Sequence, residues 1–263
     1  MPSPQLPWIT DDEPLPPSSQ AFGPHTDAPG LLAVGGSVHP ARLNEAYRRG
    51  VFPWYSPGQP PLWWAPDPRM VLPVAEFRLS ASLRKTLRRF LRSPGCELRF
   101  DSAFTRVMQA CASTPRDGQH GTWIVPEMVT AYSAWHRAGV AHSVETWVDG
   151  QLVGGLYGVG IGAMVFGESM FAHRTDASKI ALCALVGWCR LHGITLIDCQ
   201  QHTRHLASFG AREIPRRAFE AHLAQATVAE GPRLWTYDPA LWTLLGLTAD
   251  SDAAQPAGVL PLA

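Results

Sequence analysis

The chain has 263 residues, which is long enough for one large domain or two modest ones with buried cores. Its 22 Lys and Arg residues balance 22 Asp and Glu residues, so a nucleic-acid partner would have to be held by a local basic patch rather than a global field. The 5 cysteines lack paired spacing and the Pro-rich, acidic N-terminus is unlike a targeting helix, which favours reduced thiols and a cytoplasmic protein.

The first 75 residues predict a loose arm followed by a small α/β domain. Residues 1–28 are rich in Pro, Ser and Asp, which is typical of a loose arm. In residues 29–75, a short strand at 31–34 precedes a helix that begins at Pro40 and ends at Gly50. The stretch VFPWYSPGQPPLWWAPDPRMVL then predicts a rigid loop layer rich in Pro and Trp, with a domain boundary near residue 75.

The next helix, which Ser82 could cap, is strongly basic. Five cations lie between the residues of its apolar stripe. Such a pattern usually indicates a helix face that is exposed to solvent. In a neutral protein, so dense a cluster is also a candidate for phosphate contacts. The cations are Arg84, Lys85, Arg88, Arg89 and Arg92.

The remaining pattern predicts an α+β domain over residues 76–240, followed by a tail at 241–263. Helices are expected at 104–112, at 126–139 and from Asp176 or Ser178 to residue 191. Strands are expected at 142–148, 151–159, about 163–168 and in the run ITLIDCQ, and Asp149-Gly150 is a strong hairpin signal. Three antiparallel strands, a helix and a further strand form the core order of GNAT acyltransferases, with a mainly antiparallel sheet.

Residues 150–167 carry no charge and approach the length of a membrane-spanning helix. They contain seven glycines, however, which suit strands and turns better than a helix. We therefore expect strands here and no membrane span.

Two carboxylates, Glu168 and Asp198, stand at the ends of apolar strands. A buried, unpaired charge costs several kcal/mol, roughly, so each carboxylate needs a partner or a task. The helix between the two strands could bring both carboxyls to one end of the sheet. Spacing alone leaves catalysis or cation recognition and a purely structural ion pair as equal alternatives.

A nucleophilic cysteine and a metal site are weaker alternatives. If the strand persists through Asp198-Cys199-Gln200, Cys199 points away from its two polar neighbours and is a small core residue. Six residues could be imagined as zinc ligands, but their spacings match no compact zinc site, so no metal is expected. They are Cys183, Cys189, His192, Cys199, His202 and His205.

Two further features indicate which substrate the protein binds: tryptophans in predicted loops, and the absence of glycine before the helix that begins near residue 178. Trp54, Trp63, Trp64 and Trp123 are core residues or, beside a basic patch, stacking platforms for an unpaired base. The segment MFAHRTDASK has no glycine with which to build a pyrophosphate loop at the helix N-terminus. The acyl donor is therefore not expected to be CoA, and no cofactor is predicted.

Nine motifs carry a specific resemblance to a known family. In order they are LLAVGG, AYRRGVFPWYSPGQPPLWWAPDPRMVL, GTWI, AHSVETW, LVGGLYGV, FGESMF, ASK, LIDCQ and HLASFGAREIPRRAF. Together they resemble the bacterial leucyl/phenylalanyl-tRNA–protein transferases over about residues 22–236.

The resemblance implies transfer of Leu or Phe, and less readily Met, from aminoacyl-tRNA to proteins that begin with Arg or Lys. The added residue would mark those proteins for degradation by the bacterial N-degron pathway. The reaction is ester aminolysis without a covalent enzyme intermediate, so the protein mainly orients reactants and manages protons. The implied partners are Leu-tRNA, Phe-tRNA and the acceptor protein, and a monomer is expected.

The resemblance also implies roles for individual residues. Asp198 and Gln200 correspond to the catalytic pair, with Asp198 acting on the amine directly or through Gln200, and Glu168 corresponds to the carboxylate that holds the cationic acceptor end. The aminoacyl pocket would use Leu156, Val165, Gly167, Met170, Leu182, Leu185 and Ile197. Aromatic positions implied around the terminal nucleotide and aminoacyl end are Tyr47, Trp54, Trp123 and Tyr132. The basic run from Arg84 to Arg92 becomes a binding face for the tRNA acceptor stem.

Four positions depart from the family pattern: Ser37, Ala172, Asp176 and Gln201. The last two bear on acceptor-side contacts. Two other functions stay open: a tRNA-dependent transferase with a non-protein acceptor, and a non-catalytic tRNA-binding protein on the same fold.

Overall fold

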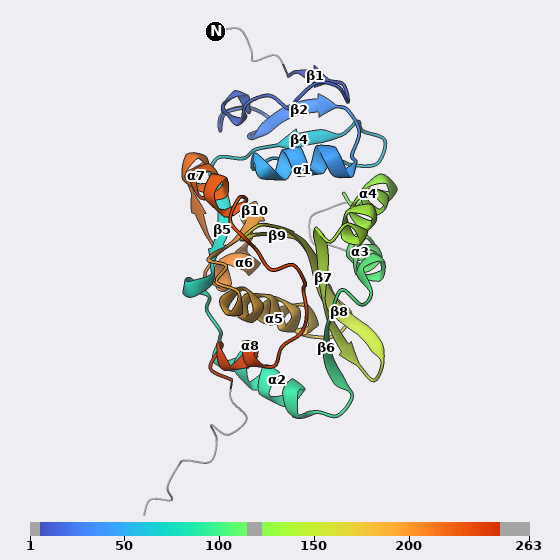
Figure 1. The fold of residues 1–263 in the computed structure, drawn as a ribbon, viewed down its shortest axis with the longest axis vertical. Coiled ribbons are helices and arrows are strands. Elements are labelled where there is room, and N and C mark those ends of the chain that lie inside the picture. The colour runs from blue at the N-terminus through green and yellow to red at the C-terminus, as the bar shows by residue number, and fades with distance from the viewer. Residues whose placement is uncertain (1–5, 115–122, 248–263) are drawn as a thin grey trace, which may run out of the picture.

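The computed structural model describes residues 6–114 and 123–247. Over this part of the chain it contains a four-stranded and a seven-stranded sheet with helices packed on both (Figure 1). The predicted α+β class is confirmed.

The small sheet and one helix form the N-terminal part of the molecule. The strands lie in the order β1-β2-β4-β3, and β1 is parallel to β2. Helix α1 begins at Pro40, as the sequence predicts, and the left-handed Gly50 follows its end. The bounds are β1 Trp8–Ile9, η1 Ser18–Gln20, β2 Leu31–Gly35, α1 Pro40–Arg48, β3 Phe52–Pro53 and β4 Leu62–Trp64.

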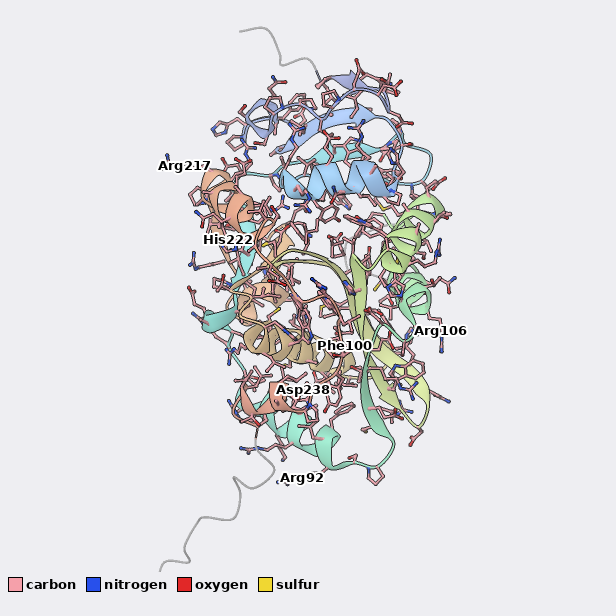
Figure 2. All side chains as sticks on the ribbon, in the orientation of Figure 1. Arg92, Phe100, Arg106, Arg217, His222 and Asp238 are labelled. Atoms are coloured by element: carbon pink, nitrogen blue, oxygen red, sulfur yellow. The ribbon has the colours of Figure 1, made fainter. Side chains whose placement is uncertain are left out.

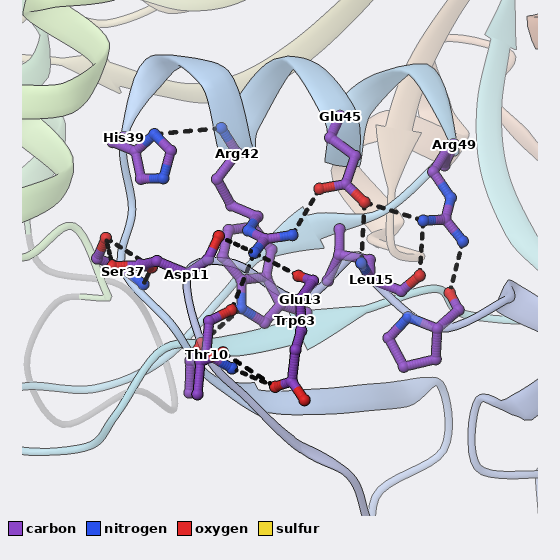
Figure 3. Close-up of polar contacts among 12 residues, drawn as sticks. Thr10, Asp11, Glu13, Leu15, Ser37, His39, Arg42, Glu45, Arg49 and Trp63 are labelled. Atoms are coloured by element: carbon purple, nitrogen blue, oxygen red, sulfur yellow. Dashed lines mark hydrogen bonds and ion pairs between the residues drawn. The ribbon is translucent and has the colours of Figure 1, made fainter.

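The described part of the expected arm is held against α1 rather than loose (Figure 3). Arg42 is buried, and its guanidinium donates to three backbone carbonyls of residues 10–13 and pairs with Glu45. Glu45 also accepts from the backbone N–H of Leu15, which is itself buried. These contacts, together with the pairing of β1, order a segment whose composition alone predicts looseness.

The large sheet has the order β11-β5-β10-β9-β8-β7-β6, and every neighbouring pair is antiparallel except β9 and β10. β5 belongs to this sheet although the sequence placed it before the domain boundary, because it pairs with both β10 and β11. The strands are β5 Arg69–Pro73, β6 Cys96–Phe100, β7 Ala141–Val148, β8 Gln151–Ile161, β9 Met164–Ala172, β10 Leu196–Gln200 and β11 Arg212–Ile214.

The run from β7 to β10 contains the predicted element order of three antiparallel strands, a helix and a strand. Asp149 and Gly150 both have positive φ at the β7–β8 turn, as a tight hairpin of this sequence requires. The uncharged segment 150–167 forms β8 and the start of β9. Among the described residues, no helix is both long and apolar enough to cross a membrane.

Helices cover both faces of the large sheet. α5 packs on one face, together with α2 and α8, while α3 and α4 pack on the other beside α1 and α7 (Figure 1). The bounds are η2 Val74–Glu76, α2 Ala81–Arg92, α3 Phe104–Ser113, α4 Pro126–Arg137, α5 Ala177–Leu191, α6 Arg204–Ser208, α7 Arg216–Ala226 and α8 Ala240–Thr243.

The capping of two helices differs from the sequence prediction, although α5 begins where it is expected. Ser80, not Ser82, caps α2 by accepting from the backbone N–H of Leu83. Asp176 stands at the cap position of α5 but makes no capping bond, because its carboxylate binds Lys179 instead.

The first part of the predicted tail is core. Leu241, Trp242, Leu245 and Leu247 are buried in the same cluster as α5. The rest of that prediction, residues 248–263, lies outside the described residues.

Candidate active site

A β-bulge in β9 carries Glu168. Ser169 and Gly167 pair with successive residues of β8, which leaves Glu168 as the extra residue between them. A bulge breaks the alternation of a strand and re-aims the side chains around it. Glu168 consequently lines a cavity together with its two neighbours.

A second bulge lies in the neighbouring parallel strand, β10. Asp198 and Gln200 pair with successive residues of β5, which leaves Cys199 unpaired, and Gln200 adopts a left-handed φ of 56°. The side-chain amide of Gln200 donates to Glu168 across the two strands, with 3.1 Å between Nε2 and Oε1. The two strand ends singled out in the sequence therefore form one site.

The cavity between the two parts of the molecule has a volume of about 620 Å³. One wall is strand β3 of the small domain with the following Trp54, and the opposite walls come from β8, β9, α5 and residues 199–206. Apolar side chains dominate the lining, while Glu168 and Gln200 supply polar groups. Such a cavity suits a substrate with an apolar side chain next to a polar or cationic centre.

Glu168 is partly buried, and burial raises the pKa of its carboxyl to about 8. A hydrogen bond from Tyr47 opposes the rise in pKa, the charge of Asp198 adds to it, and the charge of Arg69 lowers it. Both protonation states of Glu168 are therefore populated near neutral pH, which is what a group that exchanges protons with an amine needs.

Asp198 is fully buried and does not line the cavity. Arg69 holds both of its carboxylate oxygens, with Nε–Oδ1 and Nη2–Oδ2 distances of 2.8 and 2.6 Å. Oδ1 also accepts from the backbone N–H of Gln200 at 3.0 Å. Both oxygens of Asp198 therefore have partners inside the protein, and this arrangement favours the predicted route through Gln200 over direct action of Asp198 on an amine.

Cys199 lines the cavity and Asp198 does not, as their expected opposite orientation requires, but Gln200 lines the cavity on the same side as Cys199, contrary to expectation. The bulge explains the difference, because the expectation assumed that regular alternation continues through Gln200. Burial raises the pKa of the Cys199 thiol, so the reactive thiolate is disfavoured.

Most of the predicted aminoacyl pocket lines the cavity. Val165 is the exception: it is buried in the core and borders a separate small cavity instead. It lies two residues before Gly167 on β9 and pairs with Ile197, so it falls beyond the bulge that opens the cavity. The residues that do line it are Leu156, Gly167, Met170, Leu182, Leu185 and Ile197.

The predicted aromatic residues divide into two pairs. Trp54 and Trp123 line the cavity, where they can contact a substrate. Tyr47 and Tyr132 are fully buried, and their hydroxyls lie 2.5 Å apart. Neither ring has an open face, and neither lines the cavity. Tyr47 instead hydrogen-bonds the cavity residue Glu168, which favours a supporting role over direct contact with a nucleotide.

Two parts of the site were not predicted from the sequence. Thr203, His205 and Leu206, in and just before α6, complete the cavity wall. Arg69 was also missed, although an arginine directly before the apolar run MVL implies a buried cation that requires a carboxylate partner. Within the described residues, no three His, Cys, Asp or Glu side chains gather as a metal site.

The cations of the basic helix α2 differ in their exposure to solvent. Lys85, Arg89 and Arg92 are exposed, whereas Arg84 donates to the backbone carbonyls of Leu245 and Gly246. Arg84 therefore holds the C-terminal segment, a use that the sequence reading did not foresee. Arg88 is partly buried.

Three of the four departures from the family pattern have identifiable contacts. Gln201 lines the cavity, and Asp176 binds Lys179. Ser37 donates from its backbone N–H and its hydroxyl to Asp11, which supplies a carboxylate close to that position.

Comparison with known proteins places the chain among relatives that match nearly its whole length. Residues 71–224 match the model of a family described as leucyl/phenylalanyl-tRNA protein transferase, and residues 36–67 match that of its N-terminal domain. The chain belongs to this family. The proteins of that name from Methylibium petroleiphilum and Leptothrix cholodnii are 60% and 61% identical to it, covering 94% and 95% of this chain and 94% and 98% of their own. The chain is thus an enzyme of the aminoacyl-tRNA–protein transferase class.

Solved structures give a more distant likeness. The structure of L-PGS from Bacillus licheniformis has a TM-score of 0.36 and 13% identity, covering 67% of this chain and 57% of its own. The C-terminal domain of a putative lysylphosphatidylglycerol synthetase from Agrobacterium fabrum has a TM-score of 0.38 and 12% identity, covering 80% and 75%.

Proposed function

We propose that this enzyme transfers Leu or Phe, and less readily Met, from aminoacyl-tRNA to the α-amine of proteins that begin with Arg or Lys. It does so as a monomer in the cytoplasm, where charged tRNA is found. The added residue then marks the acceptor protein for the bacterial N-degron pathway.

One observation carries the proposal: an apolar cavity in which a carboxylate and an amide stand together. Leu182, Leu185 and Ile197 supply apolar surface for an unbranched or γ-branched side chain, while Glu168 and Gln200 offer acceptors to a cation. A substrate pair made of an apolar aminoacyl ester and a cationic N-terminus matches these two halves.

In the reaction, the neutral α-amine of the acceptor attacks the ester carbonyl carbon and forms the C–N bond. The tetrahedral intermediate then expels the 3′-oxygen of the terminal adenosine as the C–O bond breaks. The amine loses one proton and the leaving oxygen gains one, so the two proton transfers balance without a metal or cofactor.

Glu168 is the group suited to those proton transfers. Its pKa of about 8 lies close to that of a free α-amine, so a proton passes between an α-ammonium and this carboxylate at little cost. Gln200 orients that carboxylate through its side-chain N–H, and its side-chain oxygen is an acceptor for the amine.

The aromatic and basic surfaces serve the donor. Trp54 and Trp123 at the cavity are placed to contact the terminal nucleotide or the aminoacyl group. Lys85, Arg89 and Arg92 are exposed on α2 and suited to phosphates of the acceptor stem, which tRNAs for different amino acids share.

The test compares donors with one acceptor. Purified protein is mixed with a peptide beginning with Arg and with tRNA carrying Leu, Phe, Met, Val or Ile, and the product is read by mass spectrometry. Transfer of Leu and Phe, weaker transfer of Met and none of Val or Ile supports the proposal. An N-acetylated copy of the peptide is the control, and transfer to it would place the new bond elsewhere than on the α-amine.

A further inference from the structure

Arg69 joins the two walls of the cavity from behind. It is the first residue of β5, is fully buried, and occupies both oxygens of Asp198 with Nε and Nη2. Its remaining terminal nitrogen, Nη1, donates to the backbone carbonyl of Gly50 at 3.0 Å. Gly50 lies two residues before Phe52, where the cavity wall of the small domain begins.

Two aromatic rings fix the plane of the guanidinium. Its central carbon lies 4.8 Å from the ring centroid of Phe52 and 4.7 Å from that of Phe219. The guanidinium held between these rings keeps one orientation. Its bidentate hydrogen bonds therefore also fix the orientation of the Asp198 carboxylate.

Asp198 in turn holds the bulge. The oxygen that accepts from Arg69 Nε also accepts from the backbone N–H of Gln200, whose left-handed φ of 56° is uncommon for a residue with a side chain. That conformation directs the Gln200 amide to Glu168. The contacts therefore run without a gap from Gly50, through Arg69 and Asp198, to Gln200.

We infer that Arg69 is a positioning residue for the transfer reaction: through Asp198 it locks the bulge that presents Gln200, and through Gly50 it fixes the opposite wall. This inference rests on the proposed function. Arg69 itself touches no substrate, because it is buried behind the cavity and does not line it.

The test is a double-mutant cycle between Arg69→Gln and Asp198→Asn, read as kcat and KM for transfer of Leu to an Arg peptide. Each single variant is expected to lower kcat by about 30-fold with KM for both substrates changed by less than about threefold. Because both residues act through one bulge, the double variant is expected to match either single variant rather than multiply their losses. Multiplied losses, or a kcat within about twofold of wild type in Arg69→Gln, would overturn the inference.

Arg42→Gln is the matched control. Arg42 is also a buried arginine that pairs with a carboxylate and donates to backbone carbonyls (Figure 3). It belongs to the small domain and does not line the cavity. Arg42→Gln is expected to lower the midpoint of thermal unfolding while leaving kcat near wild type. An equal loss of kcat in Arg42→Gln would mean that any buried arginine supports activity through stability alone, and would overturn the assignment.

Arg69→Lys and a hydrogen-exchange measurement keep the inference testable even if Arg69→Gln does not fold. Lysine keeps the positive charge but cannot make the two-pronged contact, so kcat is expected to fall while the protein remains folded. In protein labelled with ¹⁵N-glutamine, the Gln200 amide is expected to lose protection from hydrogen exchange in Arg69→Lys and Arg69→Gln. Unchanged protection contradicts the inference. If the wild-type protein labels no peptide, the proposed function fails, and the exchange measurement still decides the role of Arg69.

Discussion

Gln200 and Glu168 meet across two parallel strands, each interrupted by a bulge at this point, with 3.1 Å between the amide nitrogen and the carboxylate oxygen. Regular strands would send neighbouring side chains to opposite faces of the sheet. The paired bulges instead gather polar groups at one end of an apolar cavity. The proposed proton transfers take place at this contact.

Replacing Glu168 by Gln tests its role toward the acceptor. We expect kcat/KM for an Arg peptide to fall by about 100-fold while the affinity for Leu-tRNA stays within about twofold, because the lost carboxylate faces the amine rather than the tRNA. Steady-state transfer and a tRNA filter-binding assay measure the two quantities. Glu213→Gln, on exposed β11, is the control and should change neither. Unchanged acceptor kinetics in Glu168→Gln would remove this residue from the reaction.

The raised pKa of Glu168 predicts how stability depends on pH. The folded protein binds this proton up to a pKa of about 8, whereas the ordinary value is 4.5. The folded state therefore binds more protons than the unfolded state between these two values, so this group makes the free energy of unfolding fall as pH rises from about 5 to 8. Urea unfolding at several pH values measures the trend. Glu168→Gln should flatten it, and an identical slope in the variant would contradict the assigned pKa.

The apolar end of the cavity predicts control of donor preference. Leu185→Ala enlarges a buried wall formed by α5, so we expect the ratio of Phe to Leu transfer to rise about fivefold or more. The free energy of unfolding should also fall by about 2–5 kcal/mol, because the substitution creates a cavity. Competition between Leu-tRNA and Phe-tRNA measures the ratio. Val186→Ala, buried on the same helix but away from the cavity, should lower stability and leave the ratio unchanged.

The exposed cations of α2 predict a salt-dependent contribution to tRNA binding. Replacing Lys85, Arg89 and Arg92 by Ala should weaken binding and reduce the slope of log K against log salt concentration by about 2, because fewer counterions are released. A matched triple variant removes the same charge from other exposed helix positions: Arg106, Arg137 and Arg217, two of which Figure 2 labels far from Arg92. Equal slopes in the two triple variants would mean that the exposed cations of α2 are solvated and make no specific contribution to tRNA binding.

The sequence predicted the elements around the site well, because strong local signals mark them. Asp149-Gly150 predicts the hairpin it forms, Pro40 begins its helix, and the strand carrying Asp198 is an apolar run. The mispredictions arise where tertiary contacts override local preference. Nothing local in the LIDCQ run indicates the bulge that brings Gln200 to the cavity beside Cys199, while Asp198 does not line it.

Burial was the other property that sequence could not provide. Tyr47 lies in a motif shared with the family and Tyr132 in a predicted helix, yet only the packing of α1 against α4 shows that neither ring is accessible. The sequence around Arg69 implies a carboxylate partner but not which one, because Asp198 lies 129 positions along the chain.

Transfer to a pair of peptides that differ only in their first residue shows whether the enzyme requires a cationic acceptor. The protein is incubated with radiolabelled Leu-tRNA and either a peptide beginning with Arg or an otherwise identical peptide beginning with Glu. We expect label on the α-amine of the Arg peptide and none on the Glu peptide, because the Glu168 carboxylate attracts a cationic first residue and repels an anionic one. Equal labelling of both peptides, or firm tRNA binding with no labelled peptide at all, would contradict it.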